Sequence, residues 1–227
     1  MTSEHSEQLK KLFSHIPTPR TGKFGIGADD IARIVVTPQL VPDILDCLES
    51  KEVLDVGFAL FFLQYLNSRS DFRDLLSPSL TAVTTQIRKL LSHPDHNVSI
   101  DAAGAFVAFR ENFSDYSSVM SDLLASPNSE IRRIAIGASP TYLSEKNLQE
   151  LLRLREDPAF HETGGMEGPL RYALRDFALE IAEHISGRSF NAGDCFEQRE
   201  GRRISWRSWS VFTNWLESKK GWSLFRK

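Results

Sequence analysis

Cysteine is scarce in this sequence, with only Cys47 and Cys195 among 227 residues. Two cysteines cannot form a disulfide framework, and neither has a second ligand at the spacing of a metal site. Such usage is typical of the reducing cytosol. The N-terminal stretch MTSEHSEQLKKLF has no apolar core of a secretion signal, and the longest apolar run, FALFFLQYL, is too short to span a bilayer. We therefore expect a soluble, cytoplasmic protein.

Motifs of catalysis and cofactor binding are also missing. The glycines of TGKFGIGADD are not followed by the Gly-Lys-Ser/Thr ending of a phosphate-binding loop. His93 and His96 stand across a proline turn rather than on one helix face, without further ligands at a workable spacing for a metal. A catalytic triad is a spatial arrangement and leaves little trace in one sequence. With no motif in favour of catalysis, we expect a non-catalytic protein without a metal or other cofactor.

The net charge is only −3, but it is unevenly distributed. Residues 198–227 carry eight Lys or Arg and two Asp or Glu, a net charge of +6, so the first 197 residues carry −9. A basic segment of this kind can dock on an acidic partner or on nucleic acid. It can equally pair with the acidic body of its own chain, and the sequence leaves both interpretations open.

An internal repeat is the clearest pattern in the chain. The stretches LLSHPDHNVSIDAAG and LLASPNSEIRRIAIG align at an offset of 33 residues. The aligned positions are Pro94 with Pro127, Asp95 with Asn128, Val98 with Ile131, Ala102 with Ala135, and Gly104 with Gly137. Each copy predicts a helix, a turn with proline and a capping Asp or Asn, and a second helix with apolar residues at helical spacing. A third copy starts at Leu151 and resumes over 174–185, and a degenerate copy precedes them with Ser50 at its turn.

The pattern P-[DN]-x-x-[VI]-R-x-x-A resembles the HEAT-repeat family in its short bacterial form, over residues 41–187. Arg132 and Arg175 stand where that family usually has an arginine in the second helix, whereas Ser99 departs from it. The resemblance implies an α-solenoid, in which stacked helix pairs form one extended binding surface. We therefore expect an all-α fold, an α-solenoid of HEAT-like helical hairpins with a C-terminal Trp-rich capping helix.

Three parts of the chain follow from this interpretation. They are an N-terminal segment with short helices over 1–37, an array of about four helix pairs over 38–187, and a linker with a basic Trp-rich helix and tail over 188–227. An insertion over 159–169 interrupts the array, and we expect it to project as a glycine-rich loop, the kind of segment that often carries binding.

All four tryptophans lie within residues 206–222. Residues 205–217 predict an amphipathic helix whose apolar stripe, Trp209, Phe212 and Leu216, covers the end of the array. Trp206 and Trp222 fall outside this stripe. Beside arginines such as Arg207, an exposed tryptophan suits a protein hot spot or stacking on a nucleic-acid base.

These patterns favour a protein that binds another protein, as a scaffold or as a neutralising protein of the immunity type. The alternatives are a nucleic-acid-binding HEAT-like protein or DNA glycosylase, which the acidic repeats disfavour, and a partner of a cofactor protein. The candidate binding residues lie in the second helices, the insertion and the tail: Arg132, Arg133, Arg171, Arg175, His161, Glu162, Glu167, Trp206, Arg207 and Trp222.

Overall fold

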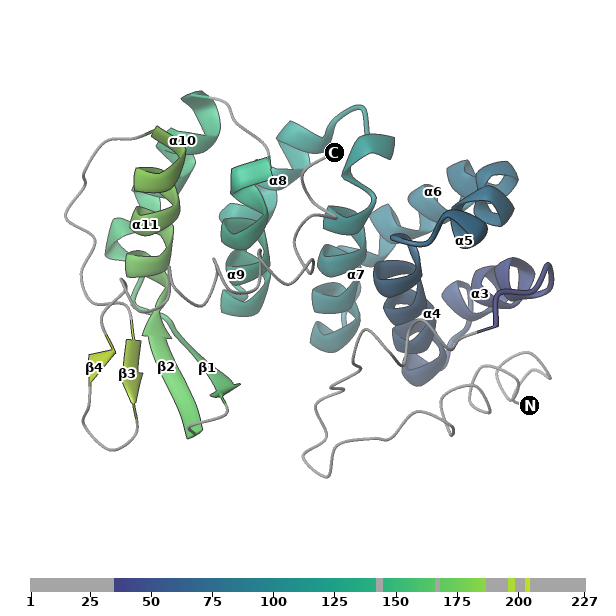
Figure 1. Ribbon diagram of the computed structural model, residues 1–227, viewed down its shortest axis with the longest axis horizontal. Coiled ribbons are helices and arrows are strands. Elements are labelled where there is room, and N and C mark those ends of the chain that lie inside the picture. The colour runs from purple at the N-terminus through teal and green to yellow at the C-terminus, as the bar shows by residue number, and fades with distance from the viewer. Residues whose placement is uncertain (1–34, 142–144, 166–167, 187–195, 199–202, 205–227) are drawn as a thin grey trace. The chain divides into compact units, whose positions relative to one another are not determined.

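Helices account for most of the described chain, as the sequence predicts. The computed structural model describes residues 35–141, 145–165, 168–186, 196–198 and 203–204 (Figure 1). The chain divides into two compact units, Met1–Ser114 and Asp115–Lys227. Within the described ranges, no helix is long and apolar enough to cross a membrane. The N-terminal segment up to residue 34 and the Trp-rich segment over 205–217 lie outside them.

The first unit consists of helices joined by short turns. Its helices are α3 (Leu40–Leu48), α4 (Val53–Leu66), α5 (Ser70–Leu76), α6 (Leu80–Leu90) and α7 (His96–Ala108). Short 3-10 turns follow α5 and α7, at Ser77–Ser79 and Arg110–Asn112. Helix α3 packs on α4, α6 packs on α7, and α4 packs on α7. The two predicted helix pairs therefore form and lie against each other, while α5 is an additional helix that the repeat pattern does not predict.

The turns between paired helices have the predicted capping chemistry. The Asp95 carboxylate accepts hydrogen bonds from the backbone N–H groups of Asn97 and Val98, at 2.9 and 3.3 Å. In the next copy, Asn128 accepts from the N–H of Glu130 at 2.9 Å. Each cap satisfies backbone donors that the first turn of a helix cannot pair internally. The offset of 33 residues is thus an offset between two equivalent helix N-termini.

Small side chains let α4 and α7 approach closely. Ala102, Ala103 and Ala105 of α7 are fully buried, and a Cβ atom at Gly104 would lie 2.5 Å from the side-chain oxygen of Gln64 on α4. The Gln64 amide donates to the backbone carbonyl of Asp101 at 3.0 Å. One turn further on, the Asn67 amide donates to the carbonyl of Ala108 at 2.7 Å. Two amides of α4 therefore bond to the backbone of α7, which fixes the register of the two helices.

The second unit combines helices with a small sheet. Its helices are α8 (Tyr116–Leu124), α9 (Ser129–Ala138), α10 (Glu145–Arg153) and α11 (Leu174–Ser186). Short 3-10 turns follow α9 and α10, at Ser139–Thr141 and Leu154–Glu156. Helix α8 packs on α9 and on α10, and α11 packs on α9 and on α10. The third copy of the repeat accordingly resumes at Leu174, the residue that the sequence predicts.

The interruption of this copy is a β-hairpin, not the loop expected over residues 159–169. Strands β1 (Phe160–Gly165) and β2 (Gly168–Ala173) pair antiparallel, with Phe160 opposite Ala173 and Gly165 opposite Gly168. Strand β3 (Phe196–Gln198) pairs with β2, and β4 (Arg203–Ile204) pairs with β3, giving the order β1-β2-β3-β4 (Figure 1). The mostly helical fold therefore contains one small antiparallel sheet that the sequence analysis does not anticipate.

Asp101 occupies an unfavourable place for a charge in the first unit. Its carboxylate lies close to α4, where a Cβ atom at Gly57 would be 3.7 Å from it. Burial, and secondarily the negative charge of Asp95, raise the pKa of Asp101 to about 6, compared with the usual 3.8. The protonated form is therefore the form that the folded state prefers.

We expect Asp101→Asn to stabilise the protein at pH 8 and to change little at pH 4. Because the pKa is raised in the folded state, the free energy of unfolding of the wild type falls as the pH rises from about 4 to 6. After allowance for the partial exposure of the side chain, the gain at pH 8 is about 1 kcal/mol. Denaturant unfolding at both pH values measures it, with the exposed Glu111→Gln as a control for net charge. A destabilised Asp101→Asn at pH 8 would contradict this account.

Candidate functional site

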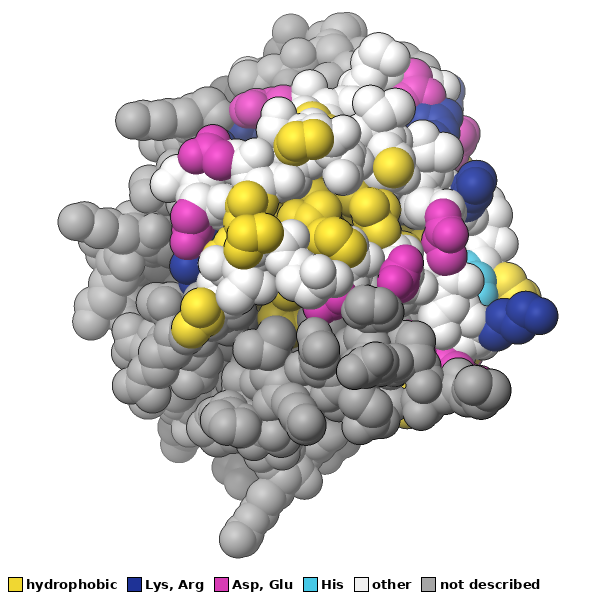
Figure 2. All heavy atoms as spheres, turned by 90° about the vertical axis from the view of Figure 1, so that its right-hand side faces the viewer, with side chains coloured by type: hydrophobic (Ala, Val, Ile, Leu, Met, Phe, Trp, Pro, Cys, Tyr) yellow, Lys and Arg dark blue, Asp and Glu magenta, His cyan; other side chains and the backbone are white. Residues whose placement is uncertain are grey.

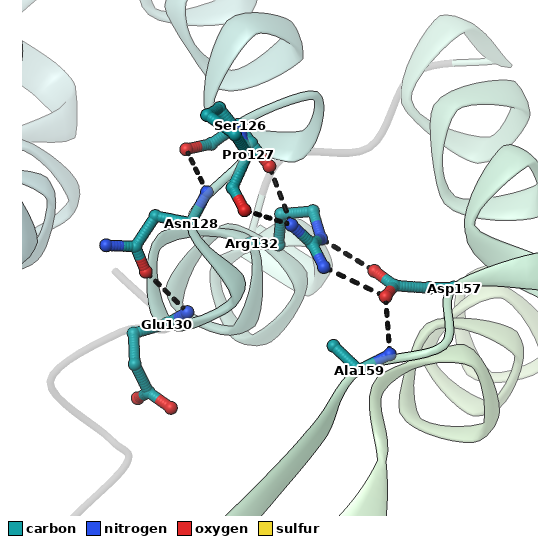
Figure 3. Close-up of polar contacts among 7 residues, drawn as sticks. All are labelled: Ser126, Pro127, Asn128, Glu130, Arg132, Asp157 and Ala159. Atoms are coloured by element: carbon teal, nitrogen blue, oxygen red, sulfur yellow. Dashed lines mark hydrogen bonds and ion pairs between the residues drawn. The ribbon is translucent and has the colours of Figure 1, made fainter.

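Arg132 is the most fully engaged of the predicted site residues. It projects from α9 and forms a two-point ion pair with Asp157, which lies in the turn between α10 and β1 (Figure 3). The distances are 2.6 Å from Nε to Oδ2 and 2.9 Å from Nη2 to Oδ1. Only 13% of the Arg132 side chain and 3% of the Asp157 side chain are exposed. This parallel geometry is the strongest form of an arginine–carboxylate contact.

The remaining polar atoms of this pair close two turns. Nη1 of Arg132 donates to the backbone carbonyls of Ser126 and Pro127, at 2.8 and 3.0 Å, in the turn that precedes its own helix (Figure 3). Oδ1 of Asp157 also accepts from the backbone N–H of Ala159 at 2.9 Å. The pair therefore ties the α8–α9 turn to the residues from which the hairpin starts. Its position and burial assign it a structural role.

A second cluster lies one residue further along each chain segment. Nδ1 of His161, in β1, is 2.5 Å from Oε1 of Glu130 in α9. Arg133 donates from Nε to the other carboxylate oxygen of Glu130 at 3.0 Å. The His161 hydrogen bond, and secondarily Arg133, hold the pKa of Glu130 at about 2, well below its usual 4.5. Glu130 is thus ionised at neutral pH and can only accept, so Nδ1 of His161 carries a proton in this contact.

Aromatic rings continue this cluster across the hairpin. The His161 ring meets the buried Tyr172 of β2 edge-on, with centroids 5.2 Å apart. Tyr172 in turn meets Phe177 of α11 edge-on at 5.5 Å. Phe160, the first residue of β1, keeps 40% of its surface exposed. The hairpin is therefore anchored to two helices while it presents one large aromatic side chain to solvent.

The other predicted residues are placed less closely. Arg175, at the start of α11, is 54% exposed and lies 3.7 Å from Asp176. In the backbone register of the sheet, Arg171 of β2 stands opposite Glu162 of β1 and Glu197 of β3. The remaining four predicted residues lie outside the described residues: Glu167, Trp206, Arg207 and Trp222. The structure thus brings together Arg132, Arg133 and His161, with Arg171 and Arg175 on the adjoining elements.

Four residues of the site did not emerge from the sequence: Glu130, Asp157, Phe160 and Tyr172. Asp157 had a usable signal, because it stands in an interhelical turn, as Asp95 and Asn128 do. The others had none, since their roles depend on contacts made by the hairpin. In the described part of the chain, no three or more His, Cys, Asp or Glu side chains are grouped to hold a metal ion. The arrangement offers charges of both signs and an exposed ring, which suit recognition of a protein surface.

Loss of Asp157 should destabilise the second unit strongly. Asp157→Ala leaves the buried guanidinium of Arg132 without its carboxylate and removes the acceptor of the Ala159 N–H, at an expected cost of about 3 kcal/mol. The surface pair Glu150–Arg153, in which 73% of the arginine side chain is exposed, provides a matched control. Arg153→Ala should cost less than about 1 kcal/mol. Chemical unfolding of both variants measures the difference, and equal effects would refute the structural role of the buried pair.

The Glu130 contact should make stability depend on pH in acid. Because the folded-state pKa lies below the usual 4.5, ionised Glu130 stabilises the fold above that pH, and the contribution disappears as the pH falls toward 2. Allowing for solvent screening of this partly exposed group, Glu130→Gln should lose about 1 kcal/mol at pH 7. The loss should shrink below pH 4.5. Unfolding curves of wild type and variant across this range test it, and a pH-independent difference would argue against a charged contact.

Comparisons with known proteins give no match for this chain. No protein-family model matches the sequence, and no curated protein is significantly similar to it. The residues and contacts described above are therefore the basis for any statement about its function.

Proposed function

We propose that this protein is a non-catalytic, cytoplasmic α-solenoid that binds another protein, with the hairpin surface of the second unit as its contact region. This surface consists of Phe160, His161, Glu130, Arg133 and Arg175. The observation that carries the proposal is the exposure of Phe160 at the base of a hairpin that is anchored on both sides. A large aromatic side chain in a fixed position contributes binding free energy without much loss of side-chain freedom.

The charges around Phe160 support a protein partner more than a nucleic acid. Arg132 is buried against Asp157, and Arg133 shares the carboxylate of Glu130. These two arginines are therefore directed at carboxylates of their own chain. A phosphate-binding surface instead needs several uncompensated cations, whose contacts make affinity fall steeply with salt. A scaffold or a neutralising, immunity-type protein is consistent with the mixed charge of this surface.

We expect Phe160→Asp to abolish partner binding without unfolding the protein. The change adds a charge at the centre of the proposed contact, and loss of an aromatic hot spot typically weakens binding by about 2 kcal/mol or more, roughly thirtyfold. Thr85→Asp, at an exposed position of α6 in the first unit, is the matched control. The measurement is affinity capture from native lysate after nuclease treatment, followed by titration of the captured partner with both purified variants.

The outcomes separate the two functional classes. A stoichiometric protein that is retained by wild type and Thr85→Asp but lost with Phe160→Asp supports the proposal. A protein retained equally by all three moves the contact to another surface. Co-purified nucleic acid with a steep salt dependence, unaffected by Phe160→Asp, would replace the proposal with the nucleic-acid-binding alternative.

A further inference from the structure

A line of apolar side chains runs along α4 in the first unit. Leu54, Phe58, Phe61 and Tyr65 follow the spacing that places residues on one face of a helix. Leu54 is 70% exposed and Tyr65 is 38% exposed, and Phe58 and Phe61 are half-buried. The Phe61 and Tyr65 rings lie 4.5 Å apart. These four residues are called the α4 stripe.

The α4 stripe is not part of the packed interior. The opposite face of the helix carries Ala59, Leu63 and Leu66, none of which is exposed. Helix α4 is thus apolar on both faces, although only one face packs against α3 and α7. A helix apolar all round normally lies inside a larger assembly, and a contiguous exposed apolar surface marks a place where another segment binds.

A matching segment occurs before α3 in the same chain. In the stretch LKKLFSHI, residues 9–16, Leu9, Leu12, Phe13 and Ile16 have the spacing i, i+3, i+4 and i+7. This spacing predicts an amphipathic helix with one apolar face. Such a helix is about 12 Å long and the α4 stripe about 16 Å, at 1.5 Å per residue, so the two apolar faces are of similar length.

We propose that residues 9–16 dock as an amphipathic helix on the α4 stripe of their own chain. Residues 17–39 then connect this helix to α3, and 23 residues can span up to roughly 70 Å. Since α3 packs directly on α4, this connection is long enough to reach any part of the stripe. A tether of this kind holds the segment at a millimolar-range effective concentration, so a small apolar contact suffices for occupancy.

Charge favours this occupant as well. Residues 35–114 of the first unit contain six Lys or Arg and ten Asp or Glu, whereas residues 9–16 contain Lys10 and Lys11 and no acidic residue. On the side shown in Figure 2, where α3, α5 and α6 lie, acidic side chains border a group of hydrophobic ones. The basic Trp-rich segment is complementary in charge too, but it follows the second unit, whereas residues 9–16 belong to the first. The inference concerns a different surface from the hairpin and does not depend on the proposed function.

Photo-cross-linking from the stripe tests the proposal directly. A photoreactive phenylalanine analogue replaces the exposed Leu54 in the full chain, and the cross-linked residues are mapped by mass spectrometry. We expect intramolecular products within residues 9–16. Leu12→Asp with Phe13→Asp should reduce their yield at least about tenfold, because two charged side chains replace the apolar contact. Gln8→Asp with Ser14→Asp changes the net charge equally on the polar face, and it should leave the yield unchanged.

Each other result would overturn the proposal. Products between two copies of the chain would assign the stripe to a self-association surface. Products within residues 205–227 would assign it to the Trp-rich segment, and a yield equal to that from the same analogue at the exposed Thr85 would show that no segment docks there. An equal loss of cross-linking in both double variants would exclude a specific apolar contact. Phe160→Asp should leave the products unchanged, so this test stands apart from that of the hairpin.

Discussion

The Arg132–Asp157 ion pair is the contact on which the second unit depends most. The guanidinium group satisfies two carbonyls of its own turn and both oxygens of a carboxylate 25 residues later in the chain. A buried guanidinium without these acceptors would be strongly destabilising. The pair therefore accepts only one position of the hairpin base relative to α9, and that position in turn brings His161 to Glu130.

The first unit solves the same packing problem without a buried charge. At the position equivalent to Arg132, 33 residues earlier, Ser99 bonds only to the carbonyl of His96 in its own turn. The register of α4 on α7 instead comes from alanines, from Gly104 and from two side-chain amides. Neutral amides bonded to helix carbonyls specify a position with a smaller desolvation cost than ions. The two units thus share a repeat pattern in sequence but differ in what fixes their helices.

The local features could be predicted from the sequence, and the long-range ones could not. The caps at Asp95 and Asn128 depend on residues two or three positions away, so the repeat alignment locates them correctly. The hairpin depends on pairing of β2 with β3, some 26 residues further along between Leu170 and Phe196, and its glycine-rich first strand shows no alternating pattern. Arg132 was found from its place in the repeat, but as a binding residue; its partner Asp157 is defined only when the hairpin base is in position.

The distribution of these contacts narrows what the surface can recognise. The charged side chains of α9 that the sequence offered for binding are directed to carboxylates of their own chain, and the histidine of the insertion faces Glu130. Apolar groups are what both units expose beyond their cores: Phe160 beside the hairpin, and Leu54 with Tyr65 on α4. Burial of such groups is favourable with any partner, so specificity must come from the charges fixed around them. Buried ion pairs that hold Phe160 in place therefore contribute to recognition even though they do not touch the partner.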